Sequence, residues 1–142
     1  MASVDVDFDI KFDELDRQIK SCTLCRLHET RTQAVPGAGD RHAKIMFVGE
    51  GPGKQEDSKG IPFVGAAGNF LNELLDYINL QRNDIYITNI VKCRPPSNRD
   101  PREDEMETCL PYLREQFKLM RPKLICTLGR FAAQKLIDPN IF

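Results

Sequence analysis

Lys44-Ile-Met-Phe-Val-Gly49 is a short, almost entirely apolar run, and the glycine-rich loop Gly49-Glu-Gly-Pro-Gly53 follows it directly. Such a run predicts a strand that is buried on both faces, as in a parallel sheet covered by helices. Two more runs have the same character, DIYITNI over 84–90 and KLICTL over 123–128. Because helical patterns alternate with these runs, we expect an α/β fold with three parallel strands and right-handed crossovers.

Apolar residues at helical spacing fill the intervals around the strands. The predicted helices cover 12–21, 68–79, 100–121 and 129–137. In the second helix we expect a buried face, formed by Phe70, Leu71, Leu74, Leu75 and Ile78. In the third helix we expect Asp100 and Glu103 to form a capping box, with Pro101 in the first turn.

Composition predicts a single domain over residues 1–142, with 41% hydrophobic and 29% charged residues. No apolar run approaches the roughly 20 residues that a membrane helix needs. The acidic N-terminus does not resemble a secretory signal, so we expect a cytoplasmic protein without membrane contact. The formal net charge of −1 does not by itself predict nucleic-acid binding. The 92–102 segment nevertheless holds four basic residues against one acidic residue, which predicts a local basic face.

Three loops are expected to meet at one site, because ligands bind beyond the carboxyl ends of parallel strands. These loops are 49–53, 89–94 and 128–130. The first loop matches no phosphate-binding motif, since a P-loop requires glycine at Val48 and a dinucleotide fingerprint requires glycine at Lys54. It is therefore either a tight turn or a backbone segment that approaches a ligand closely.

Five cysteines cannot all pair with one another, and without a secretory signal a disulfide framework is not expected. Cys22 and Cys25 form a CxxC motif, Cys93 follows after 67 intervening residues, and Cys109 after another 15. Four such thiolates suit either a [4Fe–4S] cluster or a tetrahedral zinc ion, and the wide spacing favours the cluster. The alternative is a set of buried free thiols. Cys126 lies within an apolar run and is expected in the core.

Two residues near the strand ends suit contact with a planar polar ligand. Asn89 closes an apolar strand, and its amide can donate and accept at the edge of a base. The alternative role for Asn89 is to cap the strand end. Phe63 lies in the glycine-bounded loop Gly60–Gly65 and can stack on a ring, although such a phenylalanine also fits a core position.

Together these motifs resemble the family-four uracil-DNA glycosylases, which are iron–sulfur enzymes of bacteria and archaea. The resemblance extends from Cys22 to about Leu136. Its motifs are GEGPG with Glu56-Asp57, GIPFVGAAG, ITNIVKCRPPSNRDP and RPKLICTLGRFAAQ. It implies a three-layer, uracil-DNA-glycosylase-like fold whose parallel central sheet is flanked by helices.

The resemblance also implies a role for each matching residue. Cys22, Cys25, Cys93 and Cys109 would ligate a [4Fe–4S] cluster with a structural task. Gly49, Glu50 and Gly51 would face the uracil, Phe63 would stack on it and Asn89 would bind its Watson–Crick edge. Glu50 and Asn89 would be the catalytic residues, with Glu50 either activating water or stabilising the positive charge that develops on the sugar. Lys92, Arg94, Arg99 and Arg102 would contact DNA phosphates, supported by Lys118 and Arg121.

The implied activity is the excision of uracil from DNA by a monomer, which gives free uracil and an abasic site. The sequence departs from the family where a fourth strand and a His-Pro turn would follow Ile137. His28 and His42 match no catalytic position. We therefore expect this chain to be weakly active or inactive, marginally stable, and exposed along the apolar edge of 123–128. Two alternatives remain, a non-catalytic cluster-bearing DNA-binding fragment and a zinc-stabilised α/β binding module.

Overall fold

A computed structural model describes residues 2–141, with side chains from Val6 onward. It confirms a mixed α/β fold. The helices are α1 (Ala2–Lys20), α2 (Lys54–Lys59), α3 (Ala66–Tyr77), α4 (Glu103–Met120) and α5 (Arg130–Leu136). The strands are β1 (Ala38–Gly39), β2 (Ile45–Gly49), β3 (Tyr86–Asn89) and β4 (Leu124–Thr127). Three short 3-10 turns complete the chain, η1 (Arg26–Glu29), η2 (Arg82–Asp84) and η3 (Pro96–Asn98).

The strands form one sheet in the order β1-β3-β2-β4. The central strand β2 pairs in parallel with β3, where Gly49 lies opposite Asn89, and in parallel with β4 on its other side. This confirms the predicted parallel sheet. The three expected parallel strands are β3, β2 and β4, and β1 adds a fourth strand that was not expected and runs antiparallel to β3. A two-residue strand shows no hydrophobic alternation, so the sequence pattern indicated only a loop there.

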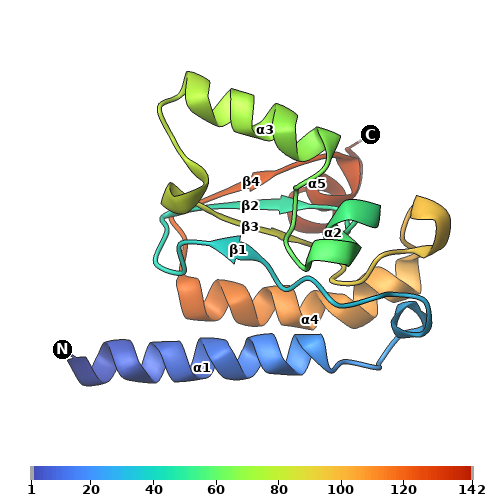
Figure 1. Cartoon of the computed structure of the whole chain (residues 1–142), viewed down its shortest axis with the longest axis horizontal. Helices are drawn as coiled ribbons and strands as arrows, with labels where there is room; N and C mark the ends of the chain where they lie inside the picture. Colours follow the sequence, from blue (N-terminus) through green and yellow to red (C-terminus); the bar gives the residue numbers. More distant parts are fainter. Residues whose placement is uncertain (1, 142) are drawn as a thin grey trace.

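Helices cover both faces of the sheet, as Figure 1 shows, with α3 on one side and α4 and α1 on the other. Alternation along the strands explains the arrangement, since successive side chains point to opposite faces. Met46, Val48 and Tyr86 pack with the core that α1 and α4 supply. Phe47 and Ile87 pack with the buried side of α3.

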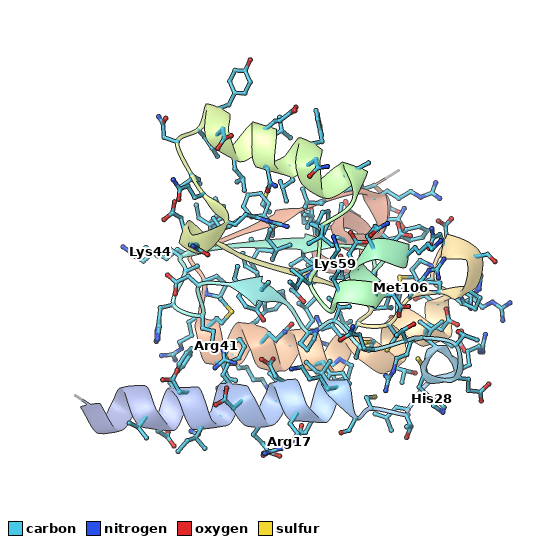
Figure 2. The ribbon with its side chains drawn as sticks, in the orientation of Figure 1. Arg17, His28, Arg41, Lys44, Lys59 and Met106 are labelled. Carbon is cyan, nitrogen blue, oxygen red and sulfur yellow. The ribbon has the colours of Figure 1, made fainter. Side chains whose placement is uncertain are left out.

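The loop before β2 contacts α1 and holds it against the rest of the molecule. Phe12 of α1 is fully buried, and the Arg41 guanidinium lies 4.4 Å from the centre of its ring. Arg41 also donates to Asp13 at 2.8 Å and to Asp16 at 3.0 Å, and Figure 2 shows it between the sheet and α1. The acidic N-terminal helix is therefore held by ion pairs as well as by its apolar stripe.

The buried face predicted for the second helix is only partly present in α3. Leu71 and Leu75 are buried, but Phe70, Leu74 and Ile78 are 61%, 47% and 60% exposed. A helix that lies on a sheet contacts it along a narrow stripe, and residues four apart form that stripe. The other apolar residues therefore lie on faces of α3 that no described element buries.

The predicted start of the third helix was also wrong. α4 begins at Glu103 with Arg102 as its N-cap, and the Glu105 carboxylate accepts from the Arg102 backbone N–H at 2.8 Å. Only the glutamate half of a capping box is thus present, two residues later than the box expected from Asp100 and Glu103. Its predicted end before Pro122 is confirmed. Within residues 2–141, no helix combines the length and the apolar character that crossing a membrane requires.

Candidate functional site

A pocket of about 260 Å³ opens where β2 and β3 end. Its lining residues come from the loop after β2, from the 56–67 segment and from the end of β3 with the turn that follows. They are Glu50, Gly51, Pro52, Gly53, Glu56, Phe63, Ala67, Asn89, Pro95, Asn98 and Arg99. Two of the three loops predicted to meet are therefore neighbours here. The third loop contributes no lining residue among those described.

Gly49 sits between the two side chains that the sequence singled out for a planar ligand. A Cβ atom at Gly49 would lie 2.5 Å from Cζ of Phe63 and 2.6 Å from Oδ1 of Asn89. Only glycine leaves room for both groups at this point. The structure thus brings together Gly49, Phe63 and Asn89, and places Glu50 and Gly51 on the adjoining wall.

The amide of Asn89 is buried but incompletely satisfied. Its side chain lies at the floor of the pocket, and among the described residues no group donates to its Oδ1. A buried acceptor without a partner is costly, and such groups are rare in native proteins. The atom is therefore available to a donor on a ligand.

The loop that carries Phe63 is held in an unusual conformation. Phe63 has φ of 55°, a left-handed value that side-chain-bearing residues seldom adopt. Glu56 accepts from the backbone N–H groups of Val64 and Gly65 in this loop, at 2.9 Å, and from that of Gly53 before α2, at 3.0 Å. Arg82 donates to the carbonyl groups of Pro62, at 3.1 Å, and Phe63. These contacts compensate for the strained backbone and fix the ring beside Gly49.

Two carboxylates of the pocket differ in electrostatic surroundings. Burial raises the pKa of Glu50, the nearby Asp100 raises it further, and Arg130 opposes the shift. Burial acts in the same direction on Glu56, but its hydrogen bonds from backbone N–H groups outweigh that effect and hold its pKa below the usual value. Glu56 is therefore held as an anion by the loop, whereas Glu50 holds a proton more readily than an ordinary glutamate does.

The basic residues expected at a DNA surface do not all face solvent. Lys92 is buried, with 1% of its surface exposed, so its predicted contact with phosphates was wrong. Its apolar neighbours in the sequence, Ile90 and Val91, continue the buried strand end. Arg99 reaches the pocket and is held by two bonds of 2.8 and 2.7 Å to the Glu105 carboxylate. Arg94 donates to Asn98 at 2.7 Å, and Arg102 is exposed.

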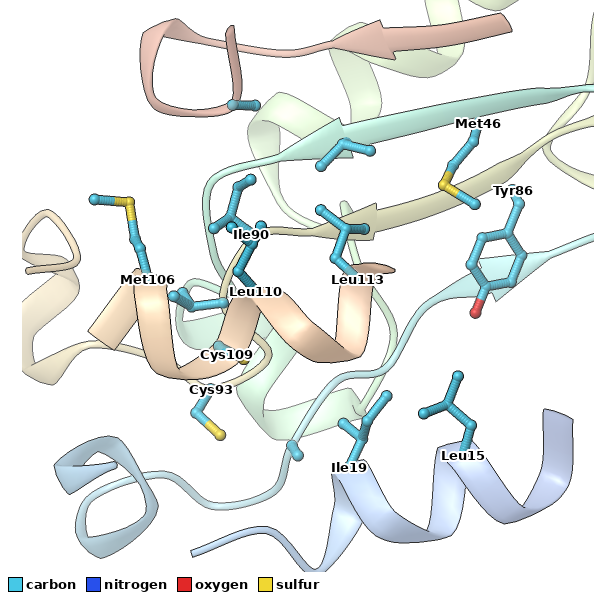
Figure 3. Packing of buried hydrophobic residues seen from close by; sticks show 14 of the residues in the cluster. Leu15, Ile19, Met46, Tyr86, Ile90, Cys93, Met106, Cys109, Leu110 and Leu113 are labelled. Carbon is cyan, nitrogen blue, oxygen red and sulfur yellow. The ribbon is translucent and has the colours of Figure 1, made fainter. Parts of the chain in front are cut away.

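Four cysteines from three distant segments line a second cavity, which we call the thiol cavity. They are Cys22, Cys25, Cys93 and Cys109. Figure 3 shows Cys93 beside Cys109 on α4. Among the described residues, no group of three or more His, Cys, Asp and Glu side chains is arranged to hold a single metal ion. Cys126 is partly buried on β4 and packs with the core under α3.

Three of these sulfur atoms accept hydrogen bonds from N–H groups. Arg31 donates to Cys93 at 3.0 Å, the Lys92 backbone to Cys109 at 3.3 Å and the Leu24 backbone to Cys22 at 3.5 Å. Burial raises the pKa of the Cys109 thiol to about 11 and also raises those of Cys25 and Cys93. Burial disfavours a free thiolate in this cavity, yet N–H donors point at the sulfur atoms. This combination fits sulfur atoms that share their negative charge with a bound metal centre.

Neither histidine of the chain lies in the pocket at the strand ends. His28 lines the thiol cavity, and its Nδ1 lies 2.7 Å from the carbonyl oxygen of Cys25. Figure 2 shows it on η1. The ring of His42 lies 4.5 Å from that of Phe8. Both positions agree with the sequence analysis, which assigned neither histidine a catalytic role.

Two functional residues escaped the sequence analysis. Glu56 was noticed only as part of a family motif. Its carboxylate accepts from the N-cap backbone N–H of Gly53, but glycine has no side chain to complete a capping box, so the sequence signal is incomplete. Arg82 gave no signal, because its importance depends on the left-handed backbone at Phe63, to which it lies close only in the folded chain.

Fold and site together define an α/β domain with an open pocket at the ends of its parallel strands and a four-cysteine cavity near it. The profile of the family described as the uracil DNA glycosylase superfamily matches residues 36–140, and the chain belongs to that superfamily.

Relatives within the superfamily support the resemblance to family four. The type-4 uracil-DNA glycosylase of Archaeoglobus fulgidus is 57% identical over 126 residues, which make up 89% of this chain and 63% of that protein. The type-4 enzyme of Sulfurisphaera tokodaii is 50% identical over 89% of this chain and 58% of its own length. For the Thermotoga maritima enzyme the values are 45%, 87% and 65%. The chain therefore spans less than two thirds of the length of these relatives.

Proposed function

We propose that this chain carries the base-binding part of a DNA-repair glycosylase that flips uracil out of DNA and hydrolyses its N-glycosidic bond. The single observation that carries the proposal is the unpartnered Oδ1 of Asn89, buried beside the Phe63 ring in a pocket next to Glu50. A base inside a duplex cannot reach such a pocket, so it must leave the stack at a cost of a few kcal/mol. The names of the type-4 relatives agree with this substrate.

Asn89 is suited to the edge of uracil because that edge has a donor between two acceptors. Its free Oδ1 would accept from the imide N–H, and its Nδ2 would donate to a neighbouring carbonyl oxygen. Phe63 would stack on the ring, and Gly49 keeps the two groups close together. A donor fixed in advance against the departing base stabilises the negative charge that the base gains as the bond breaks.

Glu50 is the second catalytic residue of the proposal. As the glycosidic bond lengthens, the sugar becomes positively charged, and a nearby carboxylate stabilises that charge or orients the water that captures it. Burial raises the pKa of Glu50, and at any pH above that pKa the side chain is the carboxylate that this role requires. The products are free uracil and an abasic site in the DNA.

We further propose that the four cysteines of the thiol cavity ligate a [4Fe–4S] cluster. Bound there, the cluster would join the end of α1, the end of β3 and α4 as a structural cross-link. Arg31 and the backbone N–H groups of Leu24 and Lys92 would then donate to ligand sulfur atoms. A brown protein with equal amounts of iron and acid-labile sulfide supports this assignment. A colourless protein with stoichiometric zinc supports the binding-module alternative instead.

The DNA-contacting surface is proposed at the three arginines near the pocket, with uracil-containing single- or double-stranded DNA as the partner of a monomer. Arg94, Arg99 and Arg102 are partly or fully exposed, and Arg99 lines the pocket itself. Arginine contacts with phosphates position a protein on DNA without reading sequence. Lys118 and Arg121 are also exposed, but they lie at the C-terminal end of α4, near the start of β2 and away from the pocket, so they are not part of the proposed surface.

Uracil release from an oligonucleotide tests the proposal. The purified chain, Asn89→Asp and the matched surface variant Asn72→Ala are incubated with a strand that contains one uracil, and with the same strand containing thymine. We expect slow release of uracil alone, unchanged in Asn72→Ala and at least about 100-fold slower in Asn89→Asp, which replaces the amide donor by an acceptor.

Binding to the same strands separates the remaining outcomes. A folded chain that prefers the uracil strand but releases no uracil acts as a non-catalytic cluster-bearing DNA-binding fragment. A folded chain that neither releases uracil nor distinguishes the two strands overturns the proposal.

A further inference from the structure

Lys92 is a buried cation, and because it is buried it cannot contact DNA. Its side chain is fully enclosed, and its Nζ donates three hydrogen bonds, to Thr88 Oγ1 at 2.7 Å, to the Asn89 carbonyl at 2.7 Å and to Gln116 Oε1 at 2.8 Å. All three acceptors are neutral. Burying an ammonium group without a carboxylate partner costs free energy, so its three fixed bonds call for a structural or functional account.

The acceptors of Lys92 belong to segments that are far apart in the sequence. Thr88 and Asn89 end β3, whereas Gln116 lies near the C-terminal end of α4. Thr88 Oγ1 and Gln116 Nε2 both donate to the carbonyl of Pro36, at 2.6 and 2.9 Å. The Lys92 ammonium is therefore part of a hydrogen-bond network that joins the end of β3, the 35–36 loop and α4.

One side of this network supports the amide that faces the pocket. Among the described residues, no hydrogen bond to Oδ1 fixes the orientation of the Asn89 side chain. Its direction therefore depends on the surrounding packing and on the backbone that carries it. The bond from Lys92 Nζ to the Asn89 carbonyl restrains that backbone at the last residue of β3.

The other side of the network reaches the thiol cavity. Lys92 lines this cavity, and its backbone N–H donates to Cys109 Sγ at 3.3 Å. Its carbonyl accepts from the Val35 N–H at 2.7 Å. Through its side chain and its backbone, this single residue contacts both the residue that reads the base and the helix that carries a proposed ligand.

We propose that Lys92 is a positioning residue that orients Asn89 for the imide edge of uracil by tying the Asn89 carbonyl to α4. The proposal rests on the function inferred above. Lys92 touches no substrate in it, and its effect passes entirely through Asn89. Removing the ammonium should therefore weaken recognition of the base while it leaves contacts to the DNA backbone intact.

The test compares Lys92→Met, which keeps the length of the side chain, with Lys118→Met, an exposed lysine of α4. Affinity is measured for free uracil and for a duplex that contains a stable abasic-site analogue. We expect Lys92→Met to bind uracil about tenfold more weakly, with less than a twofold change for the abasic duplex, and Lys118→Met to bind uracil as the parent does. Equal loss for both ligands, or no loss for uracil, overturns the proposal.

A second readout does not depend on any activity. The side-chain NH₂ signals of Asn89 in a ¹⁵N–¹H spectrum, assigned by their loss in Asn89→Asp, should shift or broaden in Lys92→Met and stay in place in Lys118→Met. If Lys92→Met does not fold, Thr88→Val removes one acceptor of the ammonium and should produce the same changes to a smaller extent. Unmoved Asn89 signals in a folded variant overturn the proposal.

These readouts also separate the inference from the function on which it rests. A parent chain that does not bind uracil counts against the proposed function, and the Asn89 signals still decide whether Lys92 positions this side chain. A parent that binds uracil beside a Lys92→Met variant with the same affinity counts against the inference alone.

Discussion

Two polar side chains at the pocket, Glu56 and Asn89, differ in whether the protein satisfies their hydrogen-bonding groups. Glu56 receives three backbone N–H donors, so the protein itself uses its carboxylate and the group is structural. Asn89 is more deeply buried, yet its Oδ1 has no donor among the described residues. Since buried polar atoms are nearly always paired, the unpaired one indicates where a ligand binds.

Glu50 should give uracil release an acidic limb at a higher pH than an unperturbed glutamate would give. The carboxylate is required, and its pKa is raised by burial and by Asp100, so activity is present above that pKa and lost as the pH falls through it. Asp100→Asn removes the repelling charge, and Arg130, whose Nη2 lies 3.6 Å from Asp100, is then freed from its partner. The limb should therefore shift to lower pH in Asp100→Asn.

Rates of uracil release across the acidic range, at low and high salt, measure this shift. Added salt should reduce the difference between Asp100→Asn and the parent, because Asp100 is exposed and its charge is screened. Glu50→Gln should lack the limb. A limb that is unchanged in Glu50→Gln would show that another group titrates.

Whole elements were predictable where a long enough pattern existed. The apolar runs predicted β2, β3 and β4 to within two residues, because a strand buried on both faces leaves a continuous signal. β1 has two residues and no pattern. The width of the buried face of α3 was overestimated, because the number of apolar residues in a helix does not reveal how many of them the sheet can cover. At the start of α4, Glu105 accepts from the Arg102 backbone N–H and from Arg99, and apolar periodicity does not reveal these contacts.

The loop that presents Phe63 should lose order when Glu56 becomes neutral. Glu56→Gln places an amide N–H among backbone donors, which we expect to destabilise the protein by about 1 kcal/mol after allowance for partial exposure. The pKa of Glu56 is lowered in the folded chain, so its contribution is present above the unfolded pKa and disappears as the pH falls through the folded pKa. Chemical denaturation near neutral pH and in acid measures both effects.

Glu73→Gln on the exposed side of α3 is the matched control and should leave the free energy of unfolding unchanged at every pH. The same loss for Glu56→Gln in acid as at neutral pH would mean that the carboxylate does not act through its charge.

β4 should make the chain prone to association through its apolar edge. Within residues 2–141 this strand pairs only with β2, and Leu124 is 57% exposed. An exposed apolar edge is a template for pairing with other chains, and lysine at such an edge opposes it. Leu124→Lys should therefore reduce concentration-dependent association and change the free energy of unfolding by less than about 0.5 kcal/mol.

Sedimentation over a range of protein concentrations tests this expectation. Ile10→Lys is the control, because Ile10 is equally apolar and 61% exposed but lies on α1, away from any sheet edge. Equal suppression of association by both substitutions would point to general surface hydrophobicity instead of the strand edge.

At the scale of the whole molecule, the sequence singled out candidate site residues but did not show how the fold connects them. Cys22 and Cys93 lie far apart in the chain, and spacing alone left a cluster, a zinc ion and free thiols open. The fold brings all four thiols to one cavity because the end of α1 and the end of β3 meet beside α4. Lys92 was misassigned because local charge density does not reveal burial, which only the tertiary packing around α4 decides.

The thiol cavity should therefore hold the end of α1, the segment after β3 and α4 together, and losing one proposed ligand should weaken the whole domain. A metal centre bound only by the folded chain contributes its binding free energy to folding. Cys93→Ser should lower the unfolding midpoint by about 10 °C or more and abolish visible absorbance, because a structural centre is worth several kcal/mol and each kcal/mol is about 4 °C at this chain length.

Cys126→Ser is the matched control. Its sulfur is outside the cavity, on β4, so both the midpoint and the colour should stay close to those of the parent. Thermal unfolding followed by circular dichroism, with iron analysis of each sample, decides the matter. Comparable losses in the two variants would mean that the thiols contribute only as packed core residues.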